Sequence, residues 1–207
     1  MAQITDLATL RQHFTEPNPL TRLKIRDHLD AQAIAFVGRS PFLLLATTAA
    51  DGGLEVSPKG DEPGFVAVAD NRTLLLPERD GNNLIFSLTN ILERPDVGLL
   101  FLLPGTGEML RVSGTATLHD DAALCQRLVS RGKPAKLVTR IAVTRAYFHC
   151  ARAILRASLW KPEGWPDPLK VSFGRVIAEA SAGQAGGEQI EAEQIDAFVA
   201  EGYRTGV

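Results

Sequence analysis

Short apolar runs separated by turn residues fill the middle of the sequence and predict a β-rich region. The clearest run is 110–118, where apolar and small residues occupy every second position, as in a strand with one buried face. Residues 97–103 are almost purely apolar, which is typical of a strand buried on both faces. The other strands are expected at 42–48, 54–57, 65–69, 73–76 and 137–147.

Apolar residues at helical spacing predict helices before the strands and between them. The first expected helix is 5–14, capped by Thr5 or Asp6, and the second is 27–37, which ends at Gly38 and has Leu29, Ala33, Phe36 and Val37 on one face. A third helix is expected after Asn82 or Asn83, with Leu84, Leu88, Ile91 and Leu92 on one face. A fourth is expected after Asp120 or Asp121 and is ended by Gly132 and Pro134. Many short strands that read as antiparallel, with two helices inserted, favour a closed barrel over a parallel α/β sheet.

The chain is expected to form a single domain in three parts. Residues 1–40 are N-terminal helices, residues 42–160 are the barrel, and residues 161–207 are a crossing segment and a short helix. The small and glycine-rich run 178–187 predicts a mobile linker. The terminal helix is expected to contain Ile190, Ile195, Phe198 and Val199.

Composition excludes several classes of protein. A formal net charge of -2 gives no reason to expect a nucleic-acid partner, which calls for a concentrated basic face. Cys125 and Cys150 form no disulfide framework and no CxxC motif, so a reducing cytoplasm is the expected location. The N-terminus does not read as a secretory signal, and no apolar run is long enough to span a membrane.

Two short stretches combine glycine with a cation, which suits an anion held by backbone N–H groups. In residues 56–61, Lys59 could provide a point charge to a phosphate while Gly60 allows close approach; the alternative is a solvated hairpin lysine. In residues 77–83, Arg79 lies just before an expected helix N-terminus, which favours negative charge. The alternative there is an ordinary asparagine cap with a solvent-facing arginine.

A third cationic segment, residues 149–160, ends the β-rich region. Arg152 and Arg156 would share one side of a helix, and two like charges favour a neutralising anion. Trp160 could pack on a flat ligand or fill the core. His149 beside Cys150 invites a metal or nucleophile interpretation, but the other histidines lack ligand spacing, so a structural histidine is favoured.

In this order, the segments resemble the pyridoxamine 5'-phosphate oxidase-related FMN-binding proteins, which have the flavin split-barrel fold. The resemblance covers about residues 42–160 and is carried by 57–60, 77–83, 95–101, 111–116 and 149–160. It implies a mainly β protein with helices (a β-barrel of the α+β kind), built on a six-stranded antiparallel split β-barrel. It also implies a homodimer with FMN in a groove between the subunits.

The resemblance implies which residues contact FMN. Ser57 and Lys59 would line the cofactor, Arg79, Asn82 and Asn83 would meet its phosphate or ribityl chain, and Arg156, Ser158 and Trp160 would approach from the last segment. The full implied set is Val56, Ser57, Lys59, Arg79, Asn82, Asn83, Arg111, Arg152, Arg156, Ser158 and Trp160.

The sequence also departs from true pyridoxamine phosphate oxidases. Leu54 stands where they have an arginine, Gly81-Asn82-Asn83 replaces their Ser-Arg-Lys run, and Leu76-Pro77 replaces their Tyr-Thr pair. Their C-terminal arginine–leucine–histidine signature has no counterpart in this sequence. The resemblance therefore implies a side branch of the family, and oxidation of vitamin B6 is not expected.

The leading functional hypothesis is an FMN-dependent oxidoreductase that moves hydride or electrons between a reductant, such as NADH or NADPH, and a small molecule. The flavin would do this chemistry, so no catalytic side chain is predicted, although Asn82 or Asn83 could tune the ring. The alternatives are a flavin- or haem-binding protein without turnover and a deazaflavin-dependent reductase. A nucleic-acid-binding barrel is disfavoured because no strand combines aromatic and basic residues.

Overall fold

The computed structural model describes residues 2–181 and 191–205 of the chain. These residues form two compact units. The first, called the barrel unit, comprises Met1–Arg79 and Leu84–Trp160. The second, called the helical unit, comprises Asp80–Asn83 and Lys161–Val207.

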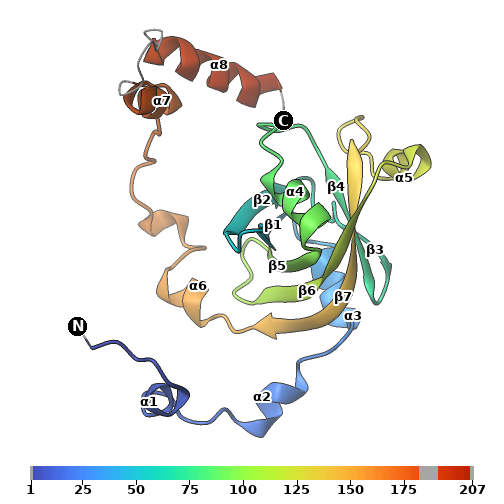
Figure 1. Cartoon of the computed structure of the whole chain (residues 1–207), viewed down its shortest axis with the longest axis vertical. Helices are drawn as coiled ribbons and strands as arrows, with labels where there is room; N and C mark the ends of the chain where they lie inside the picture. Colours follow the sequence, from blue (N-terminus) through green and yellow to red (C-terminus); the bar gives the residue numbers. More distant parts are fainter. Residues whose placement is uncertain (1, 182–190, 206–207) are drawn as a thin grey trace. The chain divides into compact units, whose positions relative to one another are not determined.

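One curled antiparallel sheet forms the barrel unit (Figure 1). Its strands are β1 Phe42–Thr48, β2 Leu54–Gly60, β3 Ala67–Asp70, β4 Thr73–Glu78, β5 Asp96–Leu102, β6 Met109–His119 and β7 Leu137–His149. They lie in the order β2-β1-β5-β6-β7-β4-β3, so β2 and β3 are the two edges and the backbone does not close the barrel. The expectation of six strands is wrong, because the short segment β3 pairs with β4 as a seventh strand.

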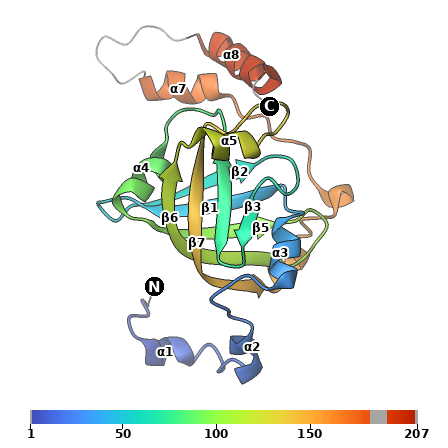
Figure 2. The ribbon, with the colours of Figure 1, turned by 90° about the vertical axis from the view of Figure 1, so that its right-hand side faces the viewer.

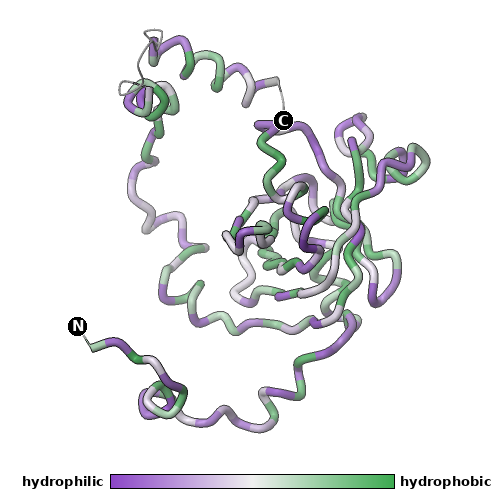
Figure 3. Tube along the Cα trace, viewed as in Figure 1, coloured by the Kyte–Doolittle hydropathy of each residue, from purple (hydrophilic) through white to green (hydrophobic). Residues whose placement is uncertain are grey.

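The inward face of the sheet contains the main core. In β5, Val97, Leu99 and Phe101 are buried, whereas Gly98 and Leu100 between them are only half-buried. The expectation that residues 97–103 are buried on both faces is therefore wrong for the single chain. Successive side chains of a strand point to opposite faces, and only the inner face is covered here. In Figure 3, hydrophobic (green) and hydrophilic (purple) segments alternate along the chain of the barrel unit.

Helices α3 Ala31–Val37 and α4 Phe86–Glu93 complete this core (Figure 2). Helix α3 packs on β3 and β7, and α4 packs on β1, β2 and β6. The Asp30 side chain accepts a 2.9 Å hydrogen bond from Ala33 N at the start of α3, and Gly38 ends that helix. The four residues expected on its buried face are all buried: Leu29, Ala33, Phe36 and Val37.

The sequence-based prediction for helix α4 is wrong for its N-cap residue and for part of its buried face. Neither Asn82 nor Asn83 caps it; Ile85 is the N-cap residue, with a left-handed φ of 48° and no capping side chain. The chain turns through left-handed positions at Asn83 and Ile85, which moves the helix start downstream. Leu92 is 75% exposed, while Asn90 is buried and donates a 3.0 Å hydrogen bond to Thr47 Oγ1.

The outer face of the sheet is covered at β4 and β7 by α5 Ala122–Arg127. Asp121 caps α5 by accepting a 2.8 Å hydrogen bond from Leu124 N, as its sequence predicts. A second, smaller core lies there and contains Leu75, Cys125, Ala135 and Val138. The outer face of β1, β2 and β5 differs, because its residues are half-buried or exposed.

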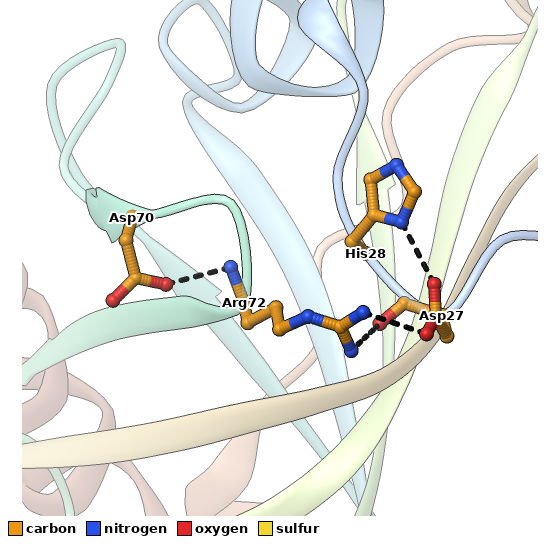
Figure 4. Close-up of polar contacts among 4 residues, drawn as sticks. All are labelled: Asp27, His28, Asp70 and Arg72. Atoms are coloured by element: carbon orange, nitrogen blue, oxygen red, sulfur yellow. Dashed lines mark hydrogen bonds and ion pairs between the residues drawn. The ribbon is translucent and has the colours of Figure 1, made fainter.

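The N-terminal helices α1 Leu7–Arg11 and α2 Pro19–Leu23 bury no residue. The chain after them is fixed to the barrel by side-chain contacts of Asp27 (Figure 4). Arg72 Nη2 lies 2.6 Å from Asp27 Oδ2, and His28 Nδ1 lies 2.7 Å from Asp27 Oδ1. Hydrogen bonds from Arg72 first, and then from His28, lower the pKa of Asp27 to about 2.

The helical unit contains the short helix η1 Pro162–Gly164 and the helices α7 Phe173–Ser181 and α8 Ala192–Thr205. Asp196 joins α7 to α8 by accepting hydrogen bonds from Ser172 Oγ at 2.6 Å and from Gly174 N at 2.9 Å.

The expected terminal helix is confirmed as α8. Residues 178–181 of the expected linker belong to α7, and the rest lies outside the described residues, as does Ile190. Among the described residues, no helix has the length and hydrophobicity needed to span a membrane.

The bend in β6 requires glycine, and this requirement can be tested. A Cβ on Gly114 would lie 2.2 Å from the carbonyl oxygen of Ala142, beside a shift in the β6–β7 register. We expect Gly114→Ala to lower the free energy of unfolding by about 1–3 kcal/mol, measured by urea denaturation. Gly202→Ala is the control, since nothing lies within 4 Å of its Cβ position. Equal stability of the two variants would contradict this account.

Candidate functional site

The gap between β2 and β4 is bridged by ion pairs of Lys59, Asp61, Glu78 and Arg79, a group called the barrel seam. Lys59 Nζ lies 2.5 Å from Glu78 Oε2. The Glu78 side chain is 8% exposed, and its other oxygen accepts a 2.9 Å hydrogen bond from Thr139 Oγ1. The lysine charge is thus neutralised by a buried carboxylate within the same chain.

The second bridge joins Arg79 to Asp61. Arg79 Nε lies 2.8 Å from Asp61 Oδ2, and Ser130 Oγ donates a 2.5 Å hydrogen bond to Asp61 Oδ1. Burial acts to raise the pKa of Asp61, but hydrogen bonds from Ser130, from the Glu62 N–H and from Arg79 outweigh it. The pKa of Asp61 therefore lies below its ordinary value.

A cavity of about 350 Å³ lies on the outer face of the sheet; we call it the outward cavity. Its walls are mostly apolar on β1, β2 and β5, whereas the polar groups come from β6 and β7. The lining residues are Leu44, Ala46, Val56, Gly98, Leu99, Leu100, Met109, Arg111, Val112, Ser113 and His149. Among the residues that the structure describes, none of those lining the cavity is acidic.

The strand register explains why most of these residues share the outer face, whereas Leu99 and Val112, which pair with each other, belong to the core. Residues directly opposite each other in an antiparallel pair project to the same side of the sheet. Ala46 is opposite both Val56 and Gly98, and Gly98 is opposite Ser113. One continuous face therefore runs from the apolar half of the sheet to the polar half.

Three cationic side chains gather at the polar end of this face. The Arg111 guanidinium carbon lies 5.5 Å from the centre of the Tyr147 ring, and Lys24 Nζ lies 5.9 Å from the same ring centre. Arg145 Nη2 donates a 3.3 Å hydrogen bond to Ser113 Oγ. We call Lys24, Arg111, Ser113, Arg145 and Tyr147 the Tyr147 cluster.

Comparison with known proteins identifies the family to which the chain belongs. The family model described as pyridoxamine 5'-phosphate oxidase matches residues 29–150, which is more than half of the chain. The chain belongs to the pyridoxamine 5'-phosphate oxidase family. The resemblance inferred from the sequence segments is thereby confirmed, and every residue that lines the outward cavity lies within the matched range.

Solved structures similar to this pyridoxamine 5'-phosphate oxidase family member share little sequence with it. HupZ of Group A Streptococcus is 18% identical, covers 58% of this chain and 93% of its own, and has a TM-score of 0.48. An FMN-binding protein from Syntrophomonas wolfei is 10% identical over 68% of this chain and 95% of its own, with a TM-score of 0.44. General Stress Protein 26 from Bacillus anthracis is 14% identical over 55% and 88%, with a TM-score of 0.41. No curated protein matches the chain.

In this family member, two of the predicted cofactor residues, Val56 and Arg111, line the outward cavity. Lys59 lies opposite the fully buried Leu43, so it projects from the inner face of β2. Ser57 lies on that inner face too, opposite the buried Leu45.

Other predicted residues lie in or just after α6 Arg152–Arg156. Arg152 and Arg156 are both exposed. Ser158 is exposed with a left-handed φ of 49°. Trp160 is half-buried, and its Nε1 donates a 2.8 Å hydrogen bond to the carbonyl oxygen of Thr106. Asn82 and Asn83 belong to the helical unit.

Sequence reasoning missed most of the polar residues in and beside the outward cavity. It weighed His149 as a metal ligand or nucleophile and favoured a structural role for it, and it did not nominate Lys24, Ser113, Arg145 or Tyr147 as site residues. A usable signal exists in β7, where Arg145, Tyr147 and His149 occupy alternate positions and must share a face. Among the described residues, no cluster of histidine, cysteine and acidic side chains could hold a metal ion.

The barrel seam predicts a pH-dependent contribution from Asp61. A carboxyl whose folded-state pKa is lowered stabilises the fold above its unfolded pKa of about 3.8, and this stabilisation is lost as pH falls through the folded value. We expect Asp61→Asn to be less stable than wild type at neutral pH, with a difference that shrinks as pH falls below 3.8. Urea unfolding at several pH values measures this, with exposed Asp120→Asn as the control. A difference independent of pH would contradict it.

Proposed function

We propose that this family member binds FMN in the outward cavity and acts, as a homodimer, as an oxidoreductase that moves hydride or electrons between a reductant and a small molecule. One observation carries the proposal. The outward cavity, within the family-matched part of the chain, combines an apolar wall with a cationic end, and none of its described lining residues is acidic.

The residues present suit FMN. Leu44, Ala46 and Leu100 give an apolar surface for a flat ring, and Gly98 among them has no side chain to block its approach. Arg111 offers the fork of donors that suits a phosphate. Ser113 and His149 can hydrogen-bond to hydroxyl groups of the chain that links ring and phosphate.

When bound, FMN supplies hydride and electron transfer. The residues of this chain bind and orient the cofactor and keep water away from it. The apolar wall excludes water from one side of the ring, and Arg111 fixes the anionic end. No side chain of the cavity is required to transfer a proton in this chemistry.

The apolar residues around the outward cavity support the homodimer. Leu54 is 81% exposed, Val56 is 55% exposed and Phe42 is 37% exposed, and all three lie on the outer face of β1 and β2. Exposed apolar side chains on one face of a sheet are typical of an interaction site. A second copy seated on it would cover the half-buried side of β5 and close the cavity from outside.

The cofactor proposal predicts a visible flavin. We expect purified protein to be yellow, or to become so when FMN is added and excess is removed, and NADH or NADPH to bleach the bound flavin under anaerobic conditions. Absorbance spectroscopy measures both steps. Colourless protein that does not retain FMN would overturn the cofactor assignment, and bound flavin that neither nucleotide reduces would remove these two nucleotides as reductants.

The dimer proposal predicts a specific effect of charge on the outer face. Leu54→Glu would place a carboxylate in the proposed interface, where its desolvation is unfavourable, so we expect a shift from dimer to monomer in sedimentation velocity. Val129→Glu is the control, since Val129 is 49% exposed but follows α5. A wild-type chain that sediments as a monomer, or equal behaviour of both variants, would contradict the proposal.

A further inference from the structure

We propose that the N-terminal arm, residues 2–25, packs on the outer face of a second subunit and covers that subunit's outward cavity. This inference rests on the proposed homodimer, and it specifies which segment of the partner completes the cavity. It does not depend on the identity of the cofactor. The arm lies before residue 29, where the match to the family model begins, so it is a feature of this chain outside the matched range.

The arm has no packing partner in its own chain. Helices α1 and α2 bury no residue, and every arm residue except Thr9 is exposed. The apolar side chains of the arm have exposed fractions from 42% to 70%. They are Ile4, Leu7, Leu10, Phe14, Leu20, Leu23 and Ile25. A chain segment with this many uncovered apolar side chains is typical of an interaction site.

The two helices of the arm need a surface to pack on. Each has five residues, and isolated helices of this length have little stability in water. Side chains cap both of them, since Asp6 accepts a 2.8 Å hydrogen bond from Thr9 N and Asn18 accepts a 2.9 Å hydrogen bond from Leu20 N. The sequence thus specifies where each helix begins, but only tertiary packing can supply most of its stability.

The arm leaves the barrel beside the outer face of the sheet. Arg26 forms an isolated bridge with Ala146, in which Arg26 N donates to Ala146 O at 3.0 Å and Ala146 N donates to Arg26 O at 2.8 Å. Because Ala146 belongs to the core, Ile25 projects to the opposite face, which is the outer one. Lys24 Nζ accordingly lies 5.9 Å from the centre of the Tyr147 ring. The arm is therefore continuous with the face that carries the proposed dimer interface.

The residues that follow the arm fix its starting point to the barrel (Figure 4). Arg72 Nη1 donates a 2.9 Å hydrogen bond to Asp27 O, and its Nη2 donates a 2.6 Å hydrogen bond to Asp27 Oδ2. Leu29 N donates a 2.8 Å hydrogen bond to Asn71 O. The direction in which the arm departs is thus determined by the turn between β3 and β4.

A second copy of the chain is the occupant that best matches both exposed surfaces. Phe42, Leu54 and Val56 on the outer face are exposed in the same chain that leaves the arm exposed, so the arm does not cover its own outer face. A two-fold dimer uses each surface twice and can cover both arms and both faces. The arm has three basic and two acidic residues, which does not favour an anionic membrane as the partner.

Cover by a partner's arm would also complete the proposed cofactor site. The sheet lines the outward cavity on one side, with Leu44, Ala46 and Leu100 in its apolar wall. Apolar side chains such as Leu20 and Leu23 of the partner's arm would exclude water from the other side.

Cross-linking between two distinguishable full-length chains tests this contact. Both chains carry Cys150→Ser, which removes the exposed thiol and leaves the buried Cys125. One chain also carries Leu20→Cys and the other Val56→Cys, and the two are coexpressed with different tags and treated with a short bismaleimide. We expect a product that contains both tags. Leu92→Cys in place of Leu20→Cys is the control, since Leu92 of α4 is 75% exposed.

Sedimentation velocity over a dilution series measures the contribution of the arm to the dimer. Leu20→Glu and Leu23→Glu should each raise the dimer dissociation constant about tenfold or more, because both subunits lose a buried apolar contact. Leu92→Glu is the matched control and should leave the constant unchanged. Thermal unfolding of each variant checks that it is folded.

The outcomes separate this inference from the proposed function. A wild-type chain that is monomeric contradicts the homodimer and the arm contact together. If wild type is a dimer, the arm contact alone is overturned by a missing two-tag product, by an equal yield with Leu92→Cys, or by dissociation constants that Leu20→Glu and Leu23→Glu do not change. A colourless dimer that forms the two-tag product and is weakened by both variants supports the arm contact, while the flavin proposal fails.

Discussion

Two ion pairs between β2 and β4 hold the barrel together where its backbone does not. The sheet has free edges at β2 and β3, and Lys59 and Arg79 cross the gap to Glu78 and Asp61. Removal of one partner from such a pair leaves a largely buried charge without compensation, which is costly. These contacts link β2, at one edge of the sheet, to β4, which lies beside the other edge strand β3.

The outer face of the sheet has an apolar half and a cationic half. The strict alternation of strand side chains buries Leu43 and Leu45 of β1 in the core and leaves Leu44 and Ala46 for the outward cavity. The same alternation in β6 and β7 places Arg111, Ser113 and His149 on this face. An apolar half beside a cationic half is the property that the proposed flavin site requires. Leu54 and Val56 are exposed on the same face, where the proposed second subunit would cover them.

The sequence predicted most elements of the barrel because local patterns specify them. Strand β1 and the capping residues Asp121 and Gly38 follow from short-range rules of alternation and capping. The start of α4 could not be predicted in this way. Its chain adopts left-handed backbone conformations at Asn83 and Ile85, where no glycine in the sequence indicates them. The number of strands implied by family resemblance was wrong, although the short apolar run 65–69 had predicted the additional strand β3.

The candidate site was harder to predict because it depends on contacts between distant residues. A lysine beside glycine reads as a phosphate ligand, and only the fold shows that Lys59 lies against Glu78, 19 residues away in sequence. Likewise, Lys24 approaches Tyr147 only because Arg26 pairs with Ala146. Resemblance had nominated Arg111, but the groups that surround it come from strand register and tertiary pairing.

The most direct test of the central claim is a crystal structure of the protein grown with FMN. The account predicts electron density for the cofactor on the outer face of β5 and β6, with the ring against Gly98 and Leu100 and the phosphate at Arg111. Cofactor bound instead at Lys59 and Arg79, with their pairs to Glu78 and Asp61 broken, would contradict it.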